Sequence, residues 1–340
     1  MSLRIDVSAP TPDPIPHDAA LLALDWGTTR LRAFLMAADG RILATRESPQ
    51  GLGALAGQGA AAFEAALQTL CADWPLDGLP AIAGGMVGAV GGWREAPYRD
   101  CPAALATLAD PALAVQVDCA RVRGGRLTLL PGLRWLPPAP ELPDVMRGEE
   151  VQIAGALALQ PALEADSWLL LPGTHAKWAR VRDGRVLHFS THMTGELYAL
   201  LRRQSLLARL MPAEDAAADA ADPHGAGWLA GLAQAARARP GDLGHALFGA
   251  RTLGLSNRLP SAELPGYLSG LLIGQELRCG LQALTADPAP LVLIGEAALC
   301  ARYADALRQL APQQPAPLQL GNTAPHGLWH CARRAGWLDG

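Results

Sequence analysis

Two short turns rich in glycine and threonine, each directly after an apolar run, carry residue types that bind phosphate. The first follows Trp26 in LLALDWGTTRLRAFL, and the second follows Pro172 in LLLPGTHAKWARV. Glycine leaves backbone N–H groups accessible and threonine adds a hydroxyl, so such turns can cradle phosphate oxygens. We expect phosphate contacts from Gly27, Thr28, Thr29 and Arg30 in the first turn, and from Gly173, Thr174, His175 and Lys177 in the second.

Charged residues beside these turns could complete a site for phosphoryl transfer. Asp25 ends the first apolar run, where its carboxylate could hold Mg²⁺ against bound phosphates through water molecules. Arg30 and Lys177 could place positive charge on a phosphoryl group in transfer. The alternatives are that Asp25 caps its turn and that His175, which could otherwise donate to phosphate or substrate, stabilises its own turn.

The segments around the two turns repeat one pattern. The first reads as a strand at 21–24, a second strand at 30–36, a hairpin turn at 38–40 and a third strand at 41–46. Residues 167–191 repeat this order, and the two turn glycines lie 146 positions apart (173 − 27). Unless two hairpins are alike by chance, the repeat predicts two α/β domains around a cleft that both turns face.

Composition favours a folded cytoplasmic protein that binds small molecules. Of 340 residues, 50% are apolar and 18% are charged, which is enough for a large core. The net charge of −4 and the scattered basic residues argue against a nucleic-acid surface. The N-terminus lacks the apolar core of a signal peptide, and the longest uncharged run, 78–93, is short and glycine-rich for a membrane span.

The six cysteines lie far apart and contain no Cys-x-x-Cys pair, so neither a zinc ribbon nor a thioredoxin-like pair is indicated. Free, mostly buried cysteines in a reducing compartment are the simplest interpretation.

Three stretches resemble the motifs of the actin-like ATPase superfamily of sugar kinases, hexokinases and chaperone ATPases. ALDWGTTRLRAFL looks like its first phosphate motif, LLLPGTHAKWARV like its second, and LVLIGEAAL like its adenosine motif. The resemblance implies two ribonuclease-H-like domains of the hexokinase type around a cleft for ATP and substrate. It places Gly295 and Glu296 at the adenosine.

We therefore expect a flexible tail at 1–18, an N-terminal domain at 19–150 with the first phosphate turn and the sugar-acid site, and a C-terminal domain at 151–340 with the second turn and the adenosine site. The last helix could pack back on the first domain.

Five longer blocks narrow the resemblance. They are AGGMVGAVGGWREAPY (83–98), VMRGEEVQIAGA (145–156), LPGTHAKW (171–178), MTGELYALL (193–201) and LSGLLIGQEL (268–277). In this order they are similar to the 2-dehydro-3-deoxygalactonokinase family, and the resemblance runs from about residue 20 to the C-terminus. It implies phosphorylation of the 6-hydroxyl of 2-dehydro-3-deoxy-D-galactonate by ATP and Mg²⁺, giving the 6-phosphate in galactonate and galactose catabolism.

Transfer to a sugar hydroxyl needs a carboxylate that orients the hydroxyl and accepts its proton. In related sugar kinases an aspartate opens a helix between the two phosphate motifs, and here Glu149 and Glu150 stand in that place. We expect Glu149 to be the base and Glu150 to be the second candidate; the alternative is a role in the helix dipole alone. The chain also has Leu171 and Pro172 where many relatives carry an aspartate, so Asp25 lacks a second acidic partner there.

The substrate is an acid, so a cation should bind its carboxylate. Arg94 and Arg147 are the candidates, with a solvated surface role as the alternative for Arg94. Trp93 could shield the site. Gly85 and Met86 lie in a glycine-rich loop that could bring backbone close to the sugar or form a simple turn.

Two helices are predicted near these motifs. Thr194 has the sequence context of an N-cap for a helix that begins near Glu196. Gly270 and Gly274 lie four apart in an apolar helix and should let it pack closely against a neighbour.

Competing functions are a kinase for another sugar or sugar acid, and an actin-like regulatory ATPase without a base. The sequence leaves open whether the galactonate or the gluconate derivative is preferred, and it is compatible with a homodimer.

Overall fold

The computed structural model describes residues 18–213, 225–239 and 241–338, and the chain divides into two compact units. The first unit comprises Met1–Pro97, Leu108–Pro131 and Leu328–Gly340, and the second comprises Tyr98–Thr107 and Gly132–Gly327. The tail expected at 1–18 lies outside the described residues except for Asp18.

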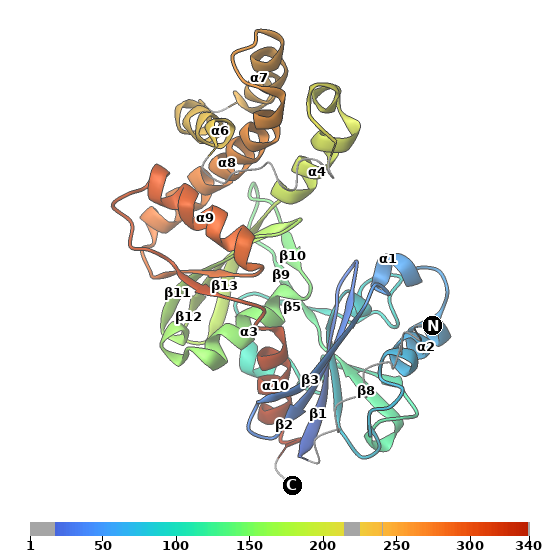
Figure 1. Ribbon diagram of the computed structural model, residues 1–340. Helices are drawn as coiled ribbons and strands as arrows, with labels where there is room; N and C mark the ends of the chain where they lie inside the picture. Colours follow the sequence, from blue (N-terminus) through green and yellow to red (C-terminus); the bar gives the residue numbers. More distant parts are fainter. Residues whose placement is uncertain (1–17, 214–224, 240, 339–340) are drawn as a thin grey trace, which may run out of the picture. The chain divides into compact units, whose positions relative to one another are not determined.

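The first unit is built on a mixed sheet with the strand order β3-β2-β1-β4-β8-β7 (Figure 1). Its strands are β1 (Ala19–Trp26), β2 (Leu31–Ala37), β3 (Ile42–Ser48), β4 (Ala81–Gly85), β7 (Val115–Asp118) and β8 (Arg126–Leu129). The meander β1–β2–β3 is antiparallel, whereas β4 is parallel to β1 and β8 is parallel to β4. Two helices follow the meander, α1 (Leu52–Leu55) and α2 (Ala60–Leu70).

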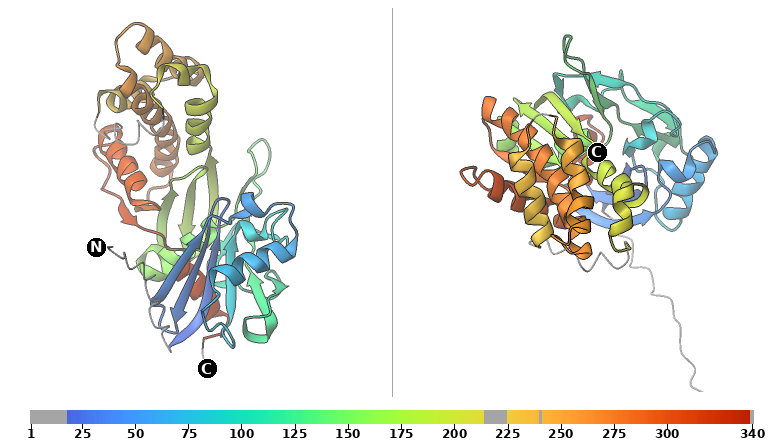
Figure 2. Two further views of the ribbon diagram at one scale, coloured as in Figure 1. Left: turned by 45° about the vertical axis from the view of Figure 1, so that its right-hand side comes forward. Right: turned by 90° about the horizontal axis from the view of Figure 1, so that it is seen from above.

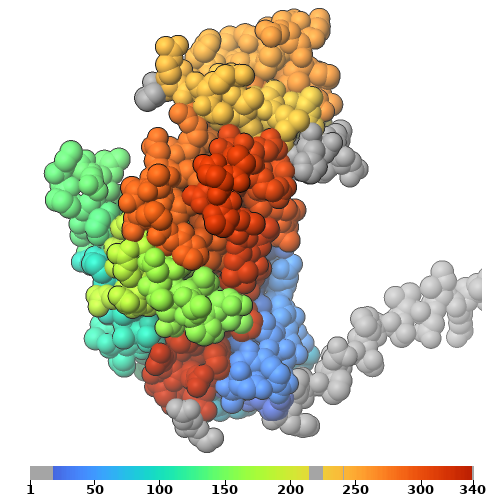
Figure 3. All heavy atoms as spheres, turned by 90° about the vertical axis from the view of Figure 1, so that its left-hand side faces the viewer, coloured from blue at the N-terminus to red at the C-terminus, as the bar shows by residue number. Residues whose placement is uncertain are grey.

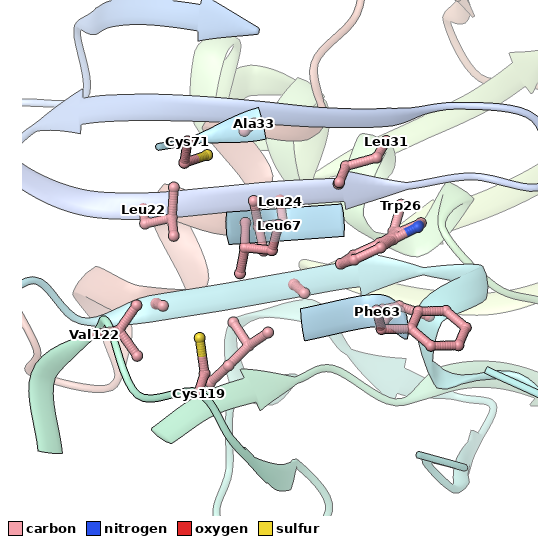
Figure 4. Packing of buried hydrophobic residues seen from close by; sticks show 14 of the residues in the cluster. Leu22, Leu24, Trp26, Leu31, Ala33, Phe63, Leu67, Cys71, Cys119 and Val122 are labelled. Carbon is pink, nitrogen blue, oxygen red and sulfur yellow. The ribbon is translucent and has the colours of Figure 1, made fainter. Parts of the chain in front are cut away.

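The core of this unit lies between the sheet and α2. Leu22, Leu24 and Trp26 of β1 face Phe63 and Leu67 of α2 (Figure 4). Alternate residues of a strand share one face, so a strand that also has Leu21 and Ala23 buried is covered on both faces. The apolar run that precedes the first turn is therefore a central strand.

The second unit repeats this strand order. Its main sheet runs β15-β14-β11-β12-β13-β6, with an antiparallel meander β11–β12–β13 and with β14 and β15 parallel to β11. The strands are β11 (Asp166–Leu171), β12 (Ala176–Arg182), β13 (Arg185–His192), β14 (Leu291–Ile294), β15 (Leu318–Leu320) and β6 (Ala103–Ala104). A smaller sheet joins β5 (Tyr98–Asp100), β9 (Gly132–Trp135) and β10 (Asp144–Met146).

In both units, therefore, three consecutive strands form an antiparallel meander. The next two strands of the sheet, on the other side of the meander's first strand, run parallel to that strand. This is the ribonuclease-H-like order, and the predicted α/β fold class is confirmed.

The helices of the second unit are α3 (Glu149–Leu159), α4 (Thr194–Gln204), α6 (Ala226–Arg237), α7 (Leu243–Leu255), α8 (Leu264–Ala286) and α9 (Ala297–Leu310). Helices α6 and α7 both pack against α8 (Figure 2), and α9 packs against α8 and α6 (Figure 3). A Cβ on Gly270 would lie 2.5 Å from the carbonyl oxygen of Trp228, and one on Gly274 would lie 2.5 Å from the Cβ of Ala235. The predicted close packing of this helix is confirmed, and its partner is α6.

The last helix, α10 (Ala324–Arg334), begins in the second unit and ends in the first. Within the first unit, the Nε1 of Trp329 donates to the carbonyl oxygen of Ala38, and the indole covers Gly40 at the tip of the β2–β3 hairpin.

None of the six cysteines forms a disulfide, and Cys71, Cys119, Cys300 and Cys331 are buried, as the sequence predicted. Within the described ranges, no helix combines the length and the apolar character that a membrane span requires.

Candidate active site

The first Gly-Thr turn lies at the carboxyl edge of the first sheet. Asp25 pairs with Gly84 and Trp26 pairs with Gly85 in the parallel β1–β4 register, so this turn and the glycine-rich loop leave neighbouring strands at the same end. Ligands of open α/β sheets bind at this edge. Gly85 has a φ of 94°, and a Cβ there would lie 2.7 Å from the carbonyl oxygen of Trp26. The close approach of the two segments therefore requires glycine.

The first turn is held from one side by the start of α1. The carbonyl oxygens of Gly27, Thr28 and Thr29 accept hydrogen bonds from the N–H groups of Leu52, Gly53 and Gly51, respectively. The N–H of Gly27 also donates to the carbonyl oxygen of Arg30. These bonds fix the turn without using the threonine hydroxyls. The Arg30 side chain is exposed and pairs with Glu47 at 3.0 Å.

Asp25 occupies the end of β1, where its side chain is 18% exposed. Its Oδ2 lies 3.3 Å from Nη1 of Arg32, a partner that the sequence analysis did not identify. Mg²⁺ is commonly bound by one or two carboxylates, and its other ligands are water and substrate phosphates. A single, partly accessible carboxylate beside a phosphate-type turn fits that donor set.

The other candidates in the first unit differ in their surroundings. Trp93 is buried, and its ring packs against Trp26 and Phe63 with centroid distances of 5.9 and 6.2 Å. Arg94 is exposed and donates to the carbonyl oxygen of Gln116. Met86 opens a short 3-10 turn directly after β4 and is half-buried.

The second turn and the adenosine-type motif meet at the corresponding edge of the second sheet. β11 and β14 are parallel neighbours, so Gly173 and Gly295 follow adjacent strands at the same end. Gly295 has a φ of 151°, and a Cβ there would lie 3.6 Å from the carbonyl oxygen of Pro172. Glu296 caps α9, because its carboxylate accepts from the N–H groups of Ala298 and Leu299, and these bonds lower its pKa.

A cavity of about 420 Å³ opens beside this edge. It is lined by Gly173, Thr174, Thr194, Gly195, Tyr198, Ser269, Leu272, Ile273, Leu299, Arg302 and Tyr303. Apolar side chains with a few convergent polar groups are typical of small-molecule sites. Both the phosphate-type turn and the helix that follows Gly295 contribute to the lining, so the cavity belongs to the same candidate site.

The start of α4 holds the second turn in place. A Cβ on Gly195 would lie 2.5 Å from the carbonyl oxygen of Gly173, and the N–H of Glu196 donates to the carbonyl oxygen of Thr174 at 3.0 Å. The Oε2 of Glu196 lies 2.5 Å from Nε2 of His175. The side chain of His175 is thus tied to α4.

The predicted N-cap at Thr194 is wrong. The helix begins at Thr194 itself, with Met193 preceding it and no side-chain cap. The Thr194 hydroxyl donates instead to Oε2 of Glu276 at 2.5 Å.

The candidate base lies next to the lysine of the second phosphate motif. The Oε1 of Glu149 is 3.1 Å from Nζ of Lys177, and its Oε2 accepts from the N–H of Arg147 at 3.1 Å. Nζ of Lys177 also donates to the carbonyl oxygen of His175. The side chain of Glu149 is 24% exposed, whereas that of Lys177 is 5% exposed. The Glu149 carboxylate is therefore accessible to a bound molecule, and the buried ammonium group of Lys177 holds it in place.

Glu150 has a different environment from its neighbour. It is 0% exposed, and its Oε2 accepts from the N–H of Gly148 at 2.7 Å. Burial, and then the charge of Glu149, raise its pKa to about 8. Among the described residues its Oε1 has no hydrogen-bond partner. Burial thus favours the protonated form of Glu150.

Arg147 precedes this pair and is nearly buried. Its guanidinium carbon lies 4.3 Å from the centre of the Tyr98 ring. Such stacking holds a guanidinium at a fixed place.

Within each unit, the structure thus brings together residues that the sequence analysis selected separately. In the first unit they are Asp25, the first turn and the loop at Gly85. In the second unit, Glu149, Arg147 and Lys177 form one group. Gly173, Thr174 and Gly295 form another, beside the cavity. Sequence reasoning missed Arg32, Tyr198, Ser269, Glu276, Arg302 and Tyr303. For Glu276 a signal exists, because a carboxylate interrupts the apolar run LSGLLIGQEL.

Comparisons with known proteins place these features in context. A family model described as 2-keto-3-deoxy-galactonokinase matches residues 25–331. The chain is 34% identical over 292 residues to the 2-dehydro-3-deoxygalactonokinase of Escherichia coli (strain K12). The match covers 86% of this chain and 90% of the relative. The chain is 38% identical over 289 residues to a probable 2-dehydro-3-deoxygalactonokinase of Rhizobium meliloti (strain 1021), covering 84% of this chain and 88% of the relative. A crystal structure from Sinorhizobium meliloti, described as a candidate 2-dehydro-3-deoxygalactonokinase, is similar with a TM-score of 0.78 at 31% identity, covering 93% of this chain and 99% of that one.

Proposed function

The chain belongs to the 2-keto-3-deoxy-galactonokinase family, and from this premise we propose that it transfers the γ-phosphoryl group of ATP to the 6-hydroxyl of 2-dehydro-3-deoxy-D-galactonate. The products would be ADP and the 6-phosphate of the sugar acid. Because none of its cysteines forms a disulfide, we also propose that the enzyme acts in the reducing cytoplasm.

One observation supports this function above the others: the contact between Glu149 and Lys177. It joins a partly exposed carboxylate at the first turn of α3 to the strand that follows a phosphate-type turn. A kinase needs a proton acceptor for the substrate hydroxyl close to the phosphoryl group. A regulatory protein that only binds ATP needs no acceptor for the proton of a substrate hydroxyl.

Glu149 accepts the proton of the 6-hydroxyl in this mechanism, while the hydroxyl oxygen attacks the γ-phosphorus. The new O–P bond forms as the bond from the γ-phosphorus to the ADP oxygen breaks. Lys177 orients Glu149, and its positive charge offsets the negative charge of the transferring group. Glu150 is fully buried, so its carboxyl group does not reach a substrate hydroxyl and does not compete as the base.

The nucleotide would be held mainly by backbone groups. We assign the phosphates to the turns at Gly27–Arg30 and Gly173–Lys177, and the adenosine to the cavity beside Gly295. Asp25 would hold Mg²⁺. The ion would supply positive charge that neutralises the phosphate oxygens.

Two cations are candidates for the carboxylate of the sugar acid. Arg147 is favoured because it adjoins Glu149 and its guanidinium is stacked on Tyr98. Arg94 is exposed and is the second candidate. The loop at Gly85 and Met86, which lies beside Asp25, offers backbone groups to the sugar.

ADP release tests the proposed substrate. The enzyme with MgATP would be offered both 2-keto-3-deoxy-hexonates, galactonate, glucose, glycerol and no sugar. We expect turnover with 2-keto-3-deoxygalactonate and little hydrolysis without a sugar acid, since closure that excludes water suppresses ATP hydrolysis. Equal hydrolysis with and without the sugar acid would refute the kinase mechanism.

A glutamine variant tests the base. We expect Glu149→Gln to lower kcat by about 10²-fold or more and to leave ATP binding unchanged. Glu141→Gln is the matched control, because Glu141 is an exposed carboxylate outside the candidate site. If Glu149→Gln keeps the wild-type kcat while Glu150→Gln loses it, the base is Glu150.

A further inference from the structure

A buried carboxyl group in α8 joins the elements that carry both nucleotide motifs of the second unit. Glu276 is 3% exposed and accepts three hydrogen bonds. Its Oε1 accepts from Nε1 of Trp178 at 3.0 Å. Its Oε2 accepts from the hydroxyls of Thr194 at 2.5 Å and Tyr303 at 2.6 Å. The three donors belong to β12, α4 and α9, so one side chain ties three elements to a fourth.

The bond to Thr194 leads to the phosphate-type turn. Thr194 is the first residue of α4, and the next two residues, Gly195 and Glu196, contact Gly173, Thr174 and His175 directly. A shift of Thr194 would therefore move the groups that hold the turn. The Thr194 hydroxyl bonds to Glu276 and not to a backbone N–H at the start of α4, so it does not cap the helix.

The bond to Trp178 fixes the strand that follows the same turn. Trp178 is the third residue of β12, which starts directly after the turn at Ala176. Its indole is fully buried, and a Cβ on Gly280 of α8 would lie 2.3 Å from it. Helix α8 thus contacts β12 in two ways, through the close packing of Gly280 on Trp178 and through the hydrogen bond from Trp178 to Glu276.

The bond to Tyr303 reaches the adenosine-type motif. Tyr303 lies in α9, whose first turn is capped by Glu296 next to Gly295. Tyr303 and Thr194 both line the 420 Å³ cavity, whereas Glu276 lies behind them. Removal of the carboxyl group would thus loosen the cavity wall without removing a lining atom.

We propose that Glu276 is a positioning residue for the nucleotide: by holding Thr194, Trp178 and Tyr303 together, it fixes the phosphate turn and the adenosine cavity in the geometry that binds ATP. This inference rests on the proposed kinase function. It predicts that changes at Glu276 act on nucleotide affinity more than on the affinity for the sugar acid.

Glu276→Gln is the most conservative test, because it keeps the size and shape of the side chain. An amide has one accepting oxygen, so its NH₂ group must face one of the three donors. At most two of the three donors then keep an oxygen acceptor at this buried site. We expect the dissociation constant for MgADP, measured by isothermal titration calorimetry, to rise by about tenfold or more.

Asp305→Asn is the matched control. Asp305 is also a buried carboxylate with three donors, from Trp228, Arg308 and Gln309, but it does not line the cavity. A general loss of stability would affect both variants, so both melting temperatures would be measured. We expect Asp305→Asn to keep the wild-type affinity for MgADP, and Glu276→Gln to raise KM for ATP more than KM for the sugar acid.

Tyr303→Phe gives a second route if Glu276→Gln does not fold, since it removes a single hydroxyl of the network. We expect it to weaken MgADP binding several-fold. Wild-type affinity in Glu276→Gln, or in Tyr303→Phe, would overturn the positioning role alone. Equal weakening in Glu276→Gln and Asp305→Asn would also overturn it. Wild-type protein that binds no MgADP would refute the proposed function, and the positioning role with it.

Discussion

Replacement of Glu150 by glutamine should change how the stability of the second unit depends on pH. Burial raises the pKa of this carboxyl group from 4.5 to about 8 in the folded protein. Between these two pH values the folded chain keeps a proton that the unfolded chain releases, so the free energy of unfolding falls as the pH rises. The stabilising contribution of protonated Glu150 is complete below pH 4.5 and is lost as the pH rises through about 8.

The size of the effect follows from the two pKa values. Each unit of difference is worth about 1.4 kcal/mol, so the gap between 4.5 and about 8 sets an upper limit of about 5 kcal/mol. Local relaxation and entry of water would reduce this limit to a few kcal/mol. Glutamine has no such titration, and its amide oxygen can still accept from the N–H of Gly148.

Urea denaturation followed by tryptophan fluorescence, at pH values from about 5 to about 8.5, measures this difference. We expect Glu150→Gln to gain stability relative to wild type as the pH rises, by a few kcal/mol across the range. Glu141→Gln serves as the exposed control and should follow the wild-type curve. A difference between Glu150→Gln and wild type that is independent of pH, or that grows toward low pH, would refute the assigned burial of a protonated carboxyl group.

Other features of the structure make further predictions. A Cβ on Gly155 would lie 1.9 Å from the carbonyl oxygen of Thr323, so Gly155→Ala should destabilise the protein by about 2 kcal/mol or more in a thermal melt. Gly244→Ala, at a helical site with nothing within 4 Å of the added Cβ, should be neutral or stabilising; equal losses would contradict the packing. Lys177→Met should lower kcat by about 10²-fold or more, because Glu149 loses its cation and the transferring group loses a positive charge; an unchanged kcat would remove Lys177 from the mechanism. Cys279 is exposed, so it should react first with a thiol reagent such as DTNB, and Cys279→Ser should abolish the fast phase.

Local patterns predicted the fold well. The apolar run that ends at Asp25, the hairpin at Gly40 and the copy of both around Gly173 depend on neighbours in the sequence, and the repeated strand order matches them. The glycine spacing of α8 predicted its close packing for the same reason, although the partner helix α6 was not identifiable.

Contacts between distant residues were beyond the reach of the sequence. The Thr194 hydroxyl pairs with a carboxyl group 82 positions away, so a cap that looked right locally is replaced by a tertiary bond. Trp93 packs in the core with Trp26 and Phe63, and its neighbours in the sequence give no sign of these contacts. The pairing of Asp25 with Arg32 could not be predicted, because Arg32 reads as an ordinary polar position of an alternating strand.

The identity of the phosphorylated product tests the central claim most directly. ³¹P NMR of the reaction of MgATP with 2-dehydro-3-deoxy-D-galactonate would show where the phosphoryl group goes. We predict that a phosphomonoester signal, coupled to the two protons on C6, grows in step with ADP. Growth of inorganic phosphate with ADP, and no phosphomonoester, would contradict the proposed kinase.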